Sequence, residues 1–176
     1  MRTSGVERRQ QEFTEFYTSS RDDCLRIVLV SVGDRQLAED LVAEAFTRAW
    51  MSWRKVREHP APRAWVVRTA LNTHVSWWRR RRRELVVDDR TAVTLLDGTQ
   101  PERSADLDLD EGLAAAIRAL PVRQREVITL RVYCGLDTDA TAKLLGIAPG
   151  TVGAHLHRAL ATLRTQKQCF SDQGVM

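Results

Sequence analysis

Residues 84–112 differ in composition from the chain on either side and so divide it into two parts. This segment carries two Lys/Arg against nine Asp/Glu and is rich in Thr, Ser, Gly and Pro. Few apolar residues and a high net charge leave too little apolar surface to bury. Because no clear helix start occurs before about residue 108, we predict an extended acidic linker between two small lobes.

The chain on either side of this segment has apolar residues at helical spacing. The clearest series recurs every four residues: Leu37, Leu41, Ala45 and Ala49. Asp34 precedes this series and can cap the helix, and 64–83 forms another long periodic run. Alternation with a period of two is nowhere sustained. We therefore predict an all-α fold of two small helical domains, 10–83 and 113–168, joined by the extended acidic linker 84–112.

Both periodic parts of the chain are basic. Residues 1–83 carry 17 Lys/Arg against 10 Asp/Glu, and residues 113–168 carry eight against three. The whole chain has a net charge of +4 and a pI of about 9.3. This distribution indicates a polyanionic partner such as nucleic acid.

The sequence lacks the usual signals of membrane insertion and of enzymatic chemistry. No apolar run approaches the roughly 20 residues that span a bilayer, and the N-terminus lacks the apolar core of a signal peptide. We therefore expect a cytoplasmic protein. Cys24, Cys134 and Cys169 lie far apart, with no Cys-x-x-Cys pair and no His at ligand spacing. Without a phosphate loop, a carboxylate cluster or a Ser/Cys–His arrangement, we expect no metal, no cofactor and no catalytic residue.

Residues 137–159 have the residue types of a helix-turn-helix at the required spacing. Asp137 is a good N-cap, and Ala142 is the small side chain that close helix contact needs. Gly146 can take the positive φ of the tight turn, and Pro149 suits the first turn of the following helix. A plain helical hairpin is the alternative, but the combination favours DNA binding. The exposed residues of the second helix would face the major groove or its phosphates: Thr151, Gly153, Ala154, His155, His157 and Arg158.

A second nucleic-acid signal is the pair Trp77-Trp78 followed by five arginines at 79–83. Arginine pairs bidentately with phosphate, and aromatic rings stack on unpaired bases. The alternative is a solvated charge run beside tryptophans that belong to the core. Because the helix-turn-helix lies downstream, we favour contact with nucleic acid.

Together these blocks resemble the extracytoplasmic-function (ECF) group of bacterial RNA polymerase sigma factors, over about residues 13–163. The sequence DRQLAEDLVAEAFTRAW at 34–50 looks like sigma region 2.2. RAWVVRTALN at 63–72, with the Trp-Trp-Arg run, looks like regions 2.3 and 2.4. LPVRQREV at 120–127 resembles the opening of region 4, which the helix-turn-helix completes.

The resemblance implies a protein that binds core RNA polymerase and directs promoter-specific initiation of transcription. Region 2 would bind the β′ clamp helices and read the −10 element as a single strand, and region 4 would read the −35 element as duplex. The polymerase β subunit and promoter DNA are then also partners, and an anti-sigma factor is a candidate, since many members of the family are held inactive by one. By motif match, the polymerase-binding residues would be Asp40, Glu44 and Arg48. Those near the −10 strand would be Trp65, Asn72, Trp77, Arg79 and Arg80.

The recognition helix departs from the family pattern at 153–155, where Gly-Ala-His replaces the common Lys-Ser-Arg. Thr141 also stands where an aliphatic residue is usual, and Ala148 replaces a capping serine. A glycine inside a helix costs about 1 kcal/mol relative to alanine, and two polar contacts to DNA are lost. We therefore expect an unusual −35 reading that depends on phosphate contacts and on three side chains: His155, His157 and Arg158.

Two other classes of protein share part of this pattern. A response-regulator-type activator often carries the sequence Gly-Thr-Val-x-x-His-Leu in its effector helix-turn-helix, and residues 150–156 of this chain have the same pattern. Such an activator lacks the blocks at 34–50 and 65–83. An adaptor that binds polymerase without DNA is the other alternative.

The acidic linker also suits a sigma factor. An extended negative segment can occupy a basic channel built for RNA until the growing transcript displaces it. We therefore expect neutralisation of Asp106, Asp108 and Asp110 to alter initiation or promoter escape.

Overall fold

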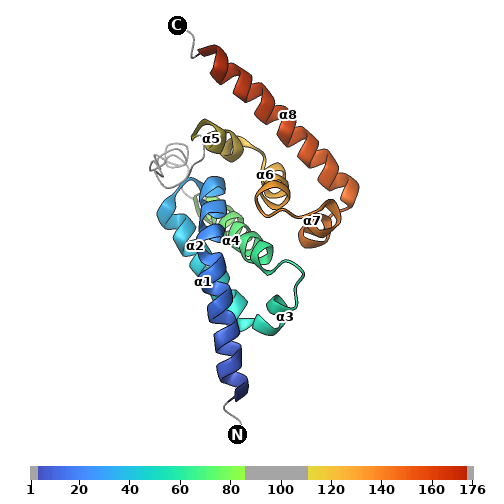
Figure 1. Cartoon of the computed structure of the whole chain (residues 1–176). Helices are drawn as coiled ribbons and strands as arrows, with labels where there is room; N and C mark the ends of the chain where they lie inside the picture. Colours follow the sequence, from blue (N-terminus) through green and yellow to red (C-terminus); the bar gives the residue numbers. More distant parts are fainter. Residues whose placement is uncertain (1–3, 86–110, 174–176) are drawn as a thin grey trace.

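The computed structural model describes residues 4–85 and 111–173, and every regular element within these ranges is helical (Figure 1). The first range contains α1 (Ser4–Val32), α2 (Arg35–Met51), α3 (Trp53–Arg57) and α4 (Pro62–Leu85). The second contains α5 (Glu111–Ala119), α6 (Val122–Ile128), the π-helical turn η1 (Thr129–Tyr133), α7 (Thr138–Leu145) and α8 (Pro149–Gln173). The all-α prediction is confirmed.

The predicted linker lies almost wholly outside the described residues, and so do Asp106, Asp108 and Asp110. Only its ends are described, and both are helical: 84–85 belongs to α4 and 111–112 belongs to α5. The side chains of 78–85 in α4 and of 167–173 in α8 are also outside the described part.

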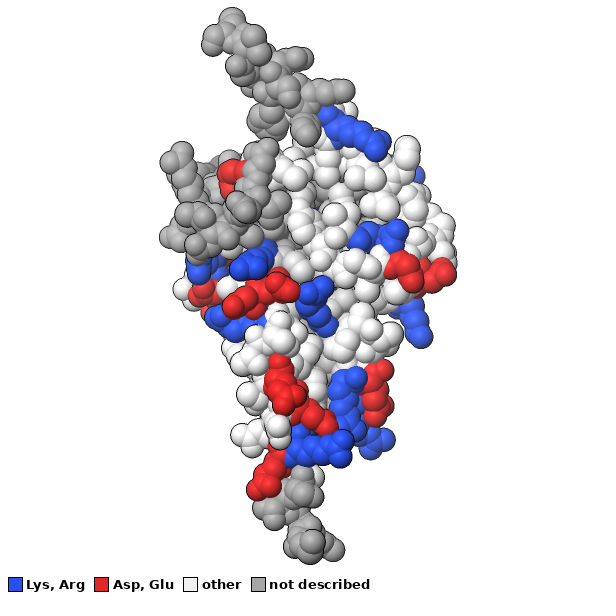
Figure 2. Space-filling model, viewed as in Figure 1, with Lys and Arg blue, Asp and Glu red and all other residues white. Residues whose placement is uncertain are grey.

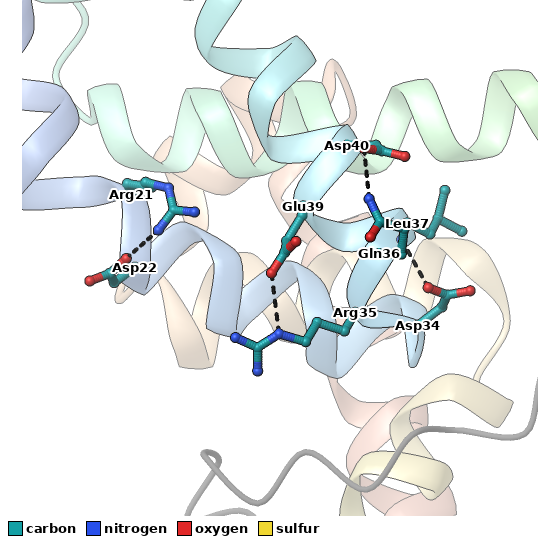
Figure 3. Close-up of polar contacts among 8 residues, drawn as sticks. All are labelled: Arg21, Asp22, Asp34, Arg35, Gln36, Leu37, Glu39 and Asp40. Carbon is teal, nitrogen blue, oxygen red and sulfur yellow. Dashed lines mark hydrogen bonds and ion pairs between the residues drawn. The ribbon is translucent and has the colours of Figure 1, made fainter.

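Helices α1, α2 and α4 form the first lobe, because each buries one apolar face against the other two. The chain reverses after α1, and the Asp34 carboxylate accepts a hydrogen bond from the backbone N–H of Leu37 at 2.9 Å, which caps α2 as predicted (Figure 3). Full burial of one valine or leucine side chain in the core of this lobe contributes about 1.5–3 kcal/mol to the stability of the fold. The core includes these residues: Cys24, Val28, Leu41, Val42, Ala45, Phe46, Ala49, Val66, Val67 and Ala70.

Aromatic side chains extend this core toward the N-terminal half of α1. The ring of Phe13 lies 5.1 Å from that of Trp50 and 5.2 Å from that of Trp53. Phe16 is also 5.2 Å from Trp53. Tilted and edge-on pairs at these distances add about 0.5–1.5 kcal/mol each beyond burial. They hold α1 against the junction of α2 and α3.

Helices α5–α8 form the second lobe around the helix-turn-helix. Val127 and Leu130, from α6 and η1, pack with Ala142 and Leu145 of α7 and with Val152 of α8. The turn η1 is π-helical because the N–H of the residue at 134 bonds to the carbonyl five positions earlier, at 3.0 Å. Turns of this kind are often found at functional positions.

The two lobes pack against each other along a surface that we call the seam. Helix α1 contacts α5 and η1, and Figure 1 shows α5 and α6 beside the α1–α4 bundle. Val30 of α1 is buried with Ile117 and Leu120 of the second lobe. Ala64 and Trp65 of α4 pack into the cluster that lies beneath the helix-turn-helix. The sequence pattern gave no indication of whether the two lobes are in contact.

No helix in the described ranges is long and apolar enough to cross a membrane. Among the same residues, no group of three His, Cys, Asp or Glu side chains is placed to hold a metal ion. Cys24 is buried and Cys134 is half-buried, and both are free thiols.

Candidate nucleic-acid interface

The helix-turn-helix forms where the sequence predicted it. The Asp137 carboxylate caps α7 by accepting the N–H of Ala140 at 2.7 Å. Gly146 ends α7 with φ 67° and ψ 39°, a left-handed conformation that a side chain disfavours. Ala142 is buried, so α7 and α8 approach closely. These features confirm the turn chemistry predicted for this motif.

Thr141 is accommodated without an unpaired polar group. Its side chain is fully buried, where the family usually carries an aliphatic residue. The hydroxyl donates to the carbonyl of Asp137 at 2.7 Å, one helical turn earlier. Because a buried hydroxyl is costly only without a partner, this departure from the pattern leaves the fold intact.

The N-terminal half of α8 has one buried face and one exposed face. Val152 and Ala159 are buried and anchor the helix, and Leu156 packs partly against the same cores. The exposed residues are Thr151, Gly153, Ala154, His157 and Arg158. His155 is half-buried instead, and its Nδ1 is buried with no hydrogen-bond partner among the described residues.

Gly153 faces open space. A Cβ placed there meets no atom within 4 Å, and the residue has an ordinary helical backbone. No packing requirement within the lobe therefore explains the glycine. Because no side chain projects from the exposed face of α8 at this position, another surface can approach the helix backbone closely.

Helix α4 carries the residues predicted to contact the −10 strand, and they differ in exposure. Asn72 is exposed, and the side chain of Trp77 is 45% exposed. Trp65 is half-buried and packs against the cores of both lobes. The helical backbone of α4 continues through Arg79 and Arg80, but their side chains lie outside the described part. Residues 65, 72 and 79 are seven apart and share one face of the helix.

The positive charge of the first lobe is concentrated at the end of α4. Five of the seven surplus positive charges in residues 1–83 are the arginines at 79–83. Elsewhere, basic and acidic side chains alternate, and Figure 2 shows them side by side on one face of the molecule. Exposed pairs of this kind, such as Arg57 with Glu12 at 2.9 Å, contribute little to stability. The described part of this face therefore has no single continuous basic surface.

Asp40, Glu44 and Arg48 lie four residues apart along the outer face of α2. Gln36 donates to the Asp40 carboxylate at 3.3 Å (Figure 3), and Arg48 Nε is 2.8 Å from Glu44 Oε1. The structure brings the three predicted residues onto one polar stripe. Their short-range pairing within α2 holds the side chains in defined positions on that stripe.

The sequence analysis missed an apolar group at the end of this stripe. Met51, three residues after Arg48, is 75% exposed, and Trp50 beside it is 37% exposed. The Arg9 guanidinium stacks over the Trp50 ring at 4.6 Å and donates to the Trp50 carbonyl at 2.7 Å. The sequence did carry a signal for Met51: the spacing 40–44–48–51 places it on the same helix face as the three predicted residues. Exposed large apolar side chains next to charged ones are typical of a protein-binding surface.

Comparisons with known proteins agree on one family. Residues 16–84 match Sigma-70 region 2, and residues 110–163 match Sigma-70, region 4. The RNA polymerase sigma-E factor of Streptomyces coelicolor is 34% identical over 155 residues, which cover 88% of this chain and 85% of the relative. The ECF RNA polymerase sigma factor SigL of Mycobacterium tuberculosis is 35% identical over 149 residues, 81% of each chain.

A solved structure shows the same fold. The sigma factor RpoE of Bartonella quintana, crystallised with the anti-sigma factor NepR, matches with a TM-score of 0.72 and 24% identity. The match covers 90% of this chain and 98% of that one.

A helical region 2 lobe and a helix-turn-helix region 4 lobe in one short chain define a transcription initiation factor. The chain belongs to the sigma-70 family, and within it to the ECF group of RNA polymerase sigma factors. The response-regulator alternative is not favoured, because it does not account for the region 2 match.

Proposed function

We propose that this sigma factor binds core RNA polymerase through α2 and reads the two promoter elements with α4 and α8. The observation that carries the proposal is the two-faced N-terminal half of α8. Its buried anchors fix the helix in the lobe, while its exposed residues form the side that can enter a major groove about 12 Å wide.

The contacts of α8 with the −35 duplex are proposed to be few and partly non-specific. Thr151, His157 and Arg158 supply hydrogen-bond donors on the exposed face. Gly153 and Ala154 supply none from their side chains, although they allow close approach of the helix backbone. Arginine commonly pairs with guanine or with phosphate. We assign His155 a supporting place at the edge of this surface, because it is half-buried.

Helix α4 is proposed to contact the −10 strand. Trp77 offers an exposed aromatic ring on which an unpaired base can stack, and Asn72 offers donors and acceptors to a base edge. Arg79 and Arg80 follow in a run of arginines suited to the phosphate backbone. Trp65 belongs to the same helix face but is covered by the second lobe in this structure.

The polar stripe of α2 is proposed to bind the β′ clamp helices. Asp40, Glu44 and Arg48 give it charge complementarity, and Met51 adds an exposed apolar anchor. The sigma factor would act by binding rather than by catalysis, in the cytoplasm. RpoE of Bartonella quintana binds an anti-sigma factor, and an anti-sigma factor remains a candidate partner of this chain.

Transcription in vitro with purified core polymerase tests the whole proposal. Promoter-dependent transcripts are expected only when this chain is added, from templates selected by co-occupancy of the protein and polymerase on DNA. Transcripts absent from every such template would exclude the sigma role assigned here.

Matched variants then test the individual surfaces. Arg158→Ala is expected to weaken −35 binding and to lower the slope of log affinity against log salt by about 1 if it pairs with phosphate. Arg164→Ala, an exposed arginine on another face of α8, is the control and is expected to bind normally. Arg48→Glu is expected to weaken polymerase binding, and exposed Arg54 provides its control as Arg54→Glu. Equal losses in a variant and its control would count against the assigned surface.

A further inference from the structure

A cavity of about 360 Å³ lies between α4 of the first lobe and the start of α6 in the second lobe. Most of its wall is apolar and comes from Leu71, Val75, Leu120, Pro121 and Val122. Leu71 and Leu120 are buried, whereas Pro121 and Val122 are exposed. The two leucines therefore form the closed end of the cavity, and solvent reaches it on the side of α6.

The volume of the cavity limits the size of the ligand that it can hold. Sites for small molecules typically have volumes of about 300–1,000 Å³, so this cavity lies at the lower end of that range. One water molecule occupies about 30 Å³ of the liquid, and the space therefore corresponds to roughly a dozen non-hydrogen atoms. A nucleotide is larger than this, and no Phe, Tyr or Trp ring lines the cavity to stack on a base.

The guanidinium of Arg125, on α6, gives the cavity a positive charge. It donates through Nη1 to the backbone carbonyl of Ser31 at 3.2 Å and through Nη2 to that of Leu120 at 3.0 Å. Among the side chains that the structure describes, no carboxylate pairs with this guanidinium, and its Nε has no hydrogen-bond partner. Burial lowers the pKa of Arg125, because the charged form is poorly solvated there. An anion in the cavity would offset this cost.

Two further titratable side chains line the cavity, and neither cancels the charge of Arg125. Glu126 is already paired with Arg123, whose Nη1 lies 2.9 Å from the Glu126 Oε2. His74 lines the cavity from α4, and burial and the charge of Arg125 lower its pKa. Its imidazole is therefore neutral near pH 7 and can donate one N–H to an anion. The cavity thus combines an apolar wall with an uncompensated positive charge and a neutral donor.

We infer that this cavity is a binding site for a small monocarboxylate of about ten non-hydrogen atoms. The carboxylate lies beside Arg125 and His74, and the apolar body of the ligand packs against Leu71, Val75 and Leu120. The charge of Arg125 repels a cation, and a neutral apolar ligand would leave that charge without a partner. None of the residues proposed to bind polymerase or DNA lines the cavity. The inference therefore goes beyond the proposed function and does not depend on it.

Isothermal titration calorimetry with the full chain and three matched probes tests the roles of the charge and of the apolar wall. Octanoate and octanamide have the same alkyl chain and the same number of non-hydrogen atoms, but only octanoate is charged at pH 7. Octanoate is expected to bind at one site per chain and at least tenfold more tightly than octanamide, because charge-assisted hydrogen bonds are stronger than neutral ones. Butyrate is expected to bind at least tenfold more weakly than octanoate, because each buried CH₂ group contributes about fourfold in affinity.

A variant that fills the cavity tests whether octanoate binds there. Val75→Trp places a large ring in the cavity from the side of α4 and is expected to abolish octanoate binding. Circular dichroism is expected to show an unchanged helix content, because Val75 is only half-buried. Val132→Trp is the matched control, since position 132 is 59% exposed and does not line the cavity. Normal binding of octanoate by a folded Val75→Trp variant would overturn the inference.

Two charge substitutions test where the carboxylate lies. Arg125→Met is expected to weaken octanoate binding at least tenfold and to leave octanamide binding within twofold of that of the wild type. Glu126→Gln removes the only carboxylate that lines the cavity and is expected to strengthen octanoate binding. If Arg125→Met weakened the binding of both probes equally, the guanidinium would not be the group that binds the carboxylate, and the inference would fail.

Nuclear magnetic resonance of methyl-labelled wild-type protein places the bound probe directly. The protons of octanoate are expected to show nuclear Overhauser contacts with the methyl groups of Leu71, Val75 and Leu120. Contacts only with other surfaces, or no saturable binding of octanoate, would overturn the inference and leave the cavity as a defect in packing. Neither measurement uses polymerase or promoter DNA, so failure of this inference and failure of the proposed function are distinguishable.

Discussion

Two glycines of the helix-turn-helix are expected to respond in opposite directions to the same substitution. At both Gly146 and Gly153, an added Cβ meets no atom within 4 Å, so packing does not distinguish them. Gly146 has φ 67°, whereas Gly153 lies inside α8 with no positive φ. The backbone conformation alone should therefore decide whether substitution by alanine raises or lowers the free energy of unfolding.

The magnitudes follow from backbone preferences. Gly153→Ala removes the helix penalty of glycine and should raise the free energy of unfolding by about 0.5–1 kcal/mol. Gly146→Ala places a side chain in the left-handed region and should lower it by about 1–2 kcal/mol. The two variants should thus differ by about 1.5–3 kcal/mol. Urea unfolding followed by circular dichroism at 222 nm measures both values.

If both substitutions changed the free energy of unfolding in the same direction, this reasoning would be refuted. The double variant should show the sum of the two effects within about 0.5 kcal/mol if the sites act independently. Polymerase binding should stay unchanged in Gly153→Ala, because α8 lies in region 4 and the polar stripe of α2 lies in region 2.

Three further predictions follow from single groups. Asp137→Ala removes the cap bond to the backbone of α7 at 2.7 Å and should lower the free energy of unfolding by about 1 kcal/mol in urea titrations. Burial and the charge of Arg125 lower the pKa of His74. The unfolded chain therefore takes up a proton more readily than the folded protein, which should lose stability as pH falls below about 6.5. This extra loss in melting temperature between pH 7.5 and 5.5 should be absent in His74→Leu. Burial raises the pKa of Cys24 to about 12, so iodoacetamide at pH 8 should leave this thiol unmodified until urea unfolds the lobe; rapid labelling of the native protein would contradict its buried position.

Local chemistry made much of this fold predictable from the sequence. The Asp34 and Asp137 caps and the left-handed Gly146 each depend on residues within one or two turns. The four-residue series in α2 likewise identified its buried face. Patterns of this kind report which side of a helix is apolar, because burial imposes the period of the helix.

The same patterns cannot state which surface covers an apolar face. Val28 and Val30 look alike in the sequence, yet one lies in its own lobe and the other lies in the seam. Trp65 was predicted at the DNA, and the structure places it between the two cores. Met51 was overlooked, because an exposed methionine differs from a buried one only in its three-dimensional surroundings.

The seam has a consequence for how such chains diversify. Ser31 and Thr129 are 98 positions apart and belong to different lobes, yet their hydroxyls meet at 3.2 Å. Substitutions at contacting residues do not act independently. A chimera that joins region 2 of this protein to region 4 of a relative would inherit both recognition surfaces but mismatched residues at the seam. Exchange of lobes between relatives would therefore alter the stability of the contact between the lobes even where it left the choice of promoter unchanged.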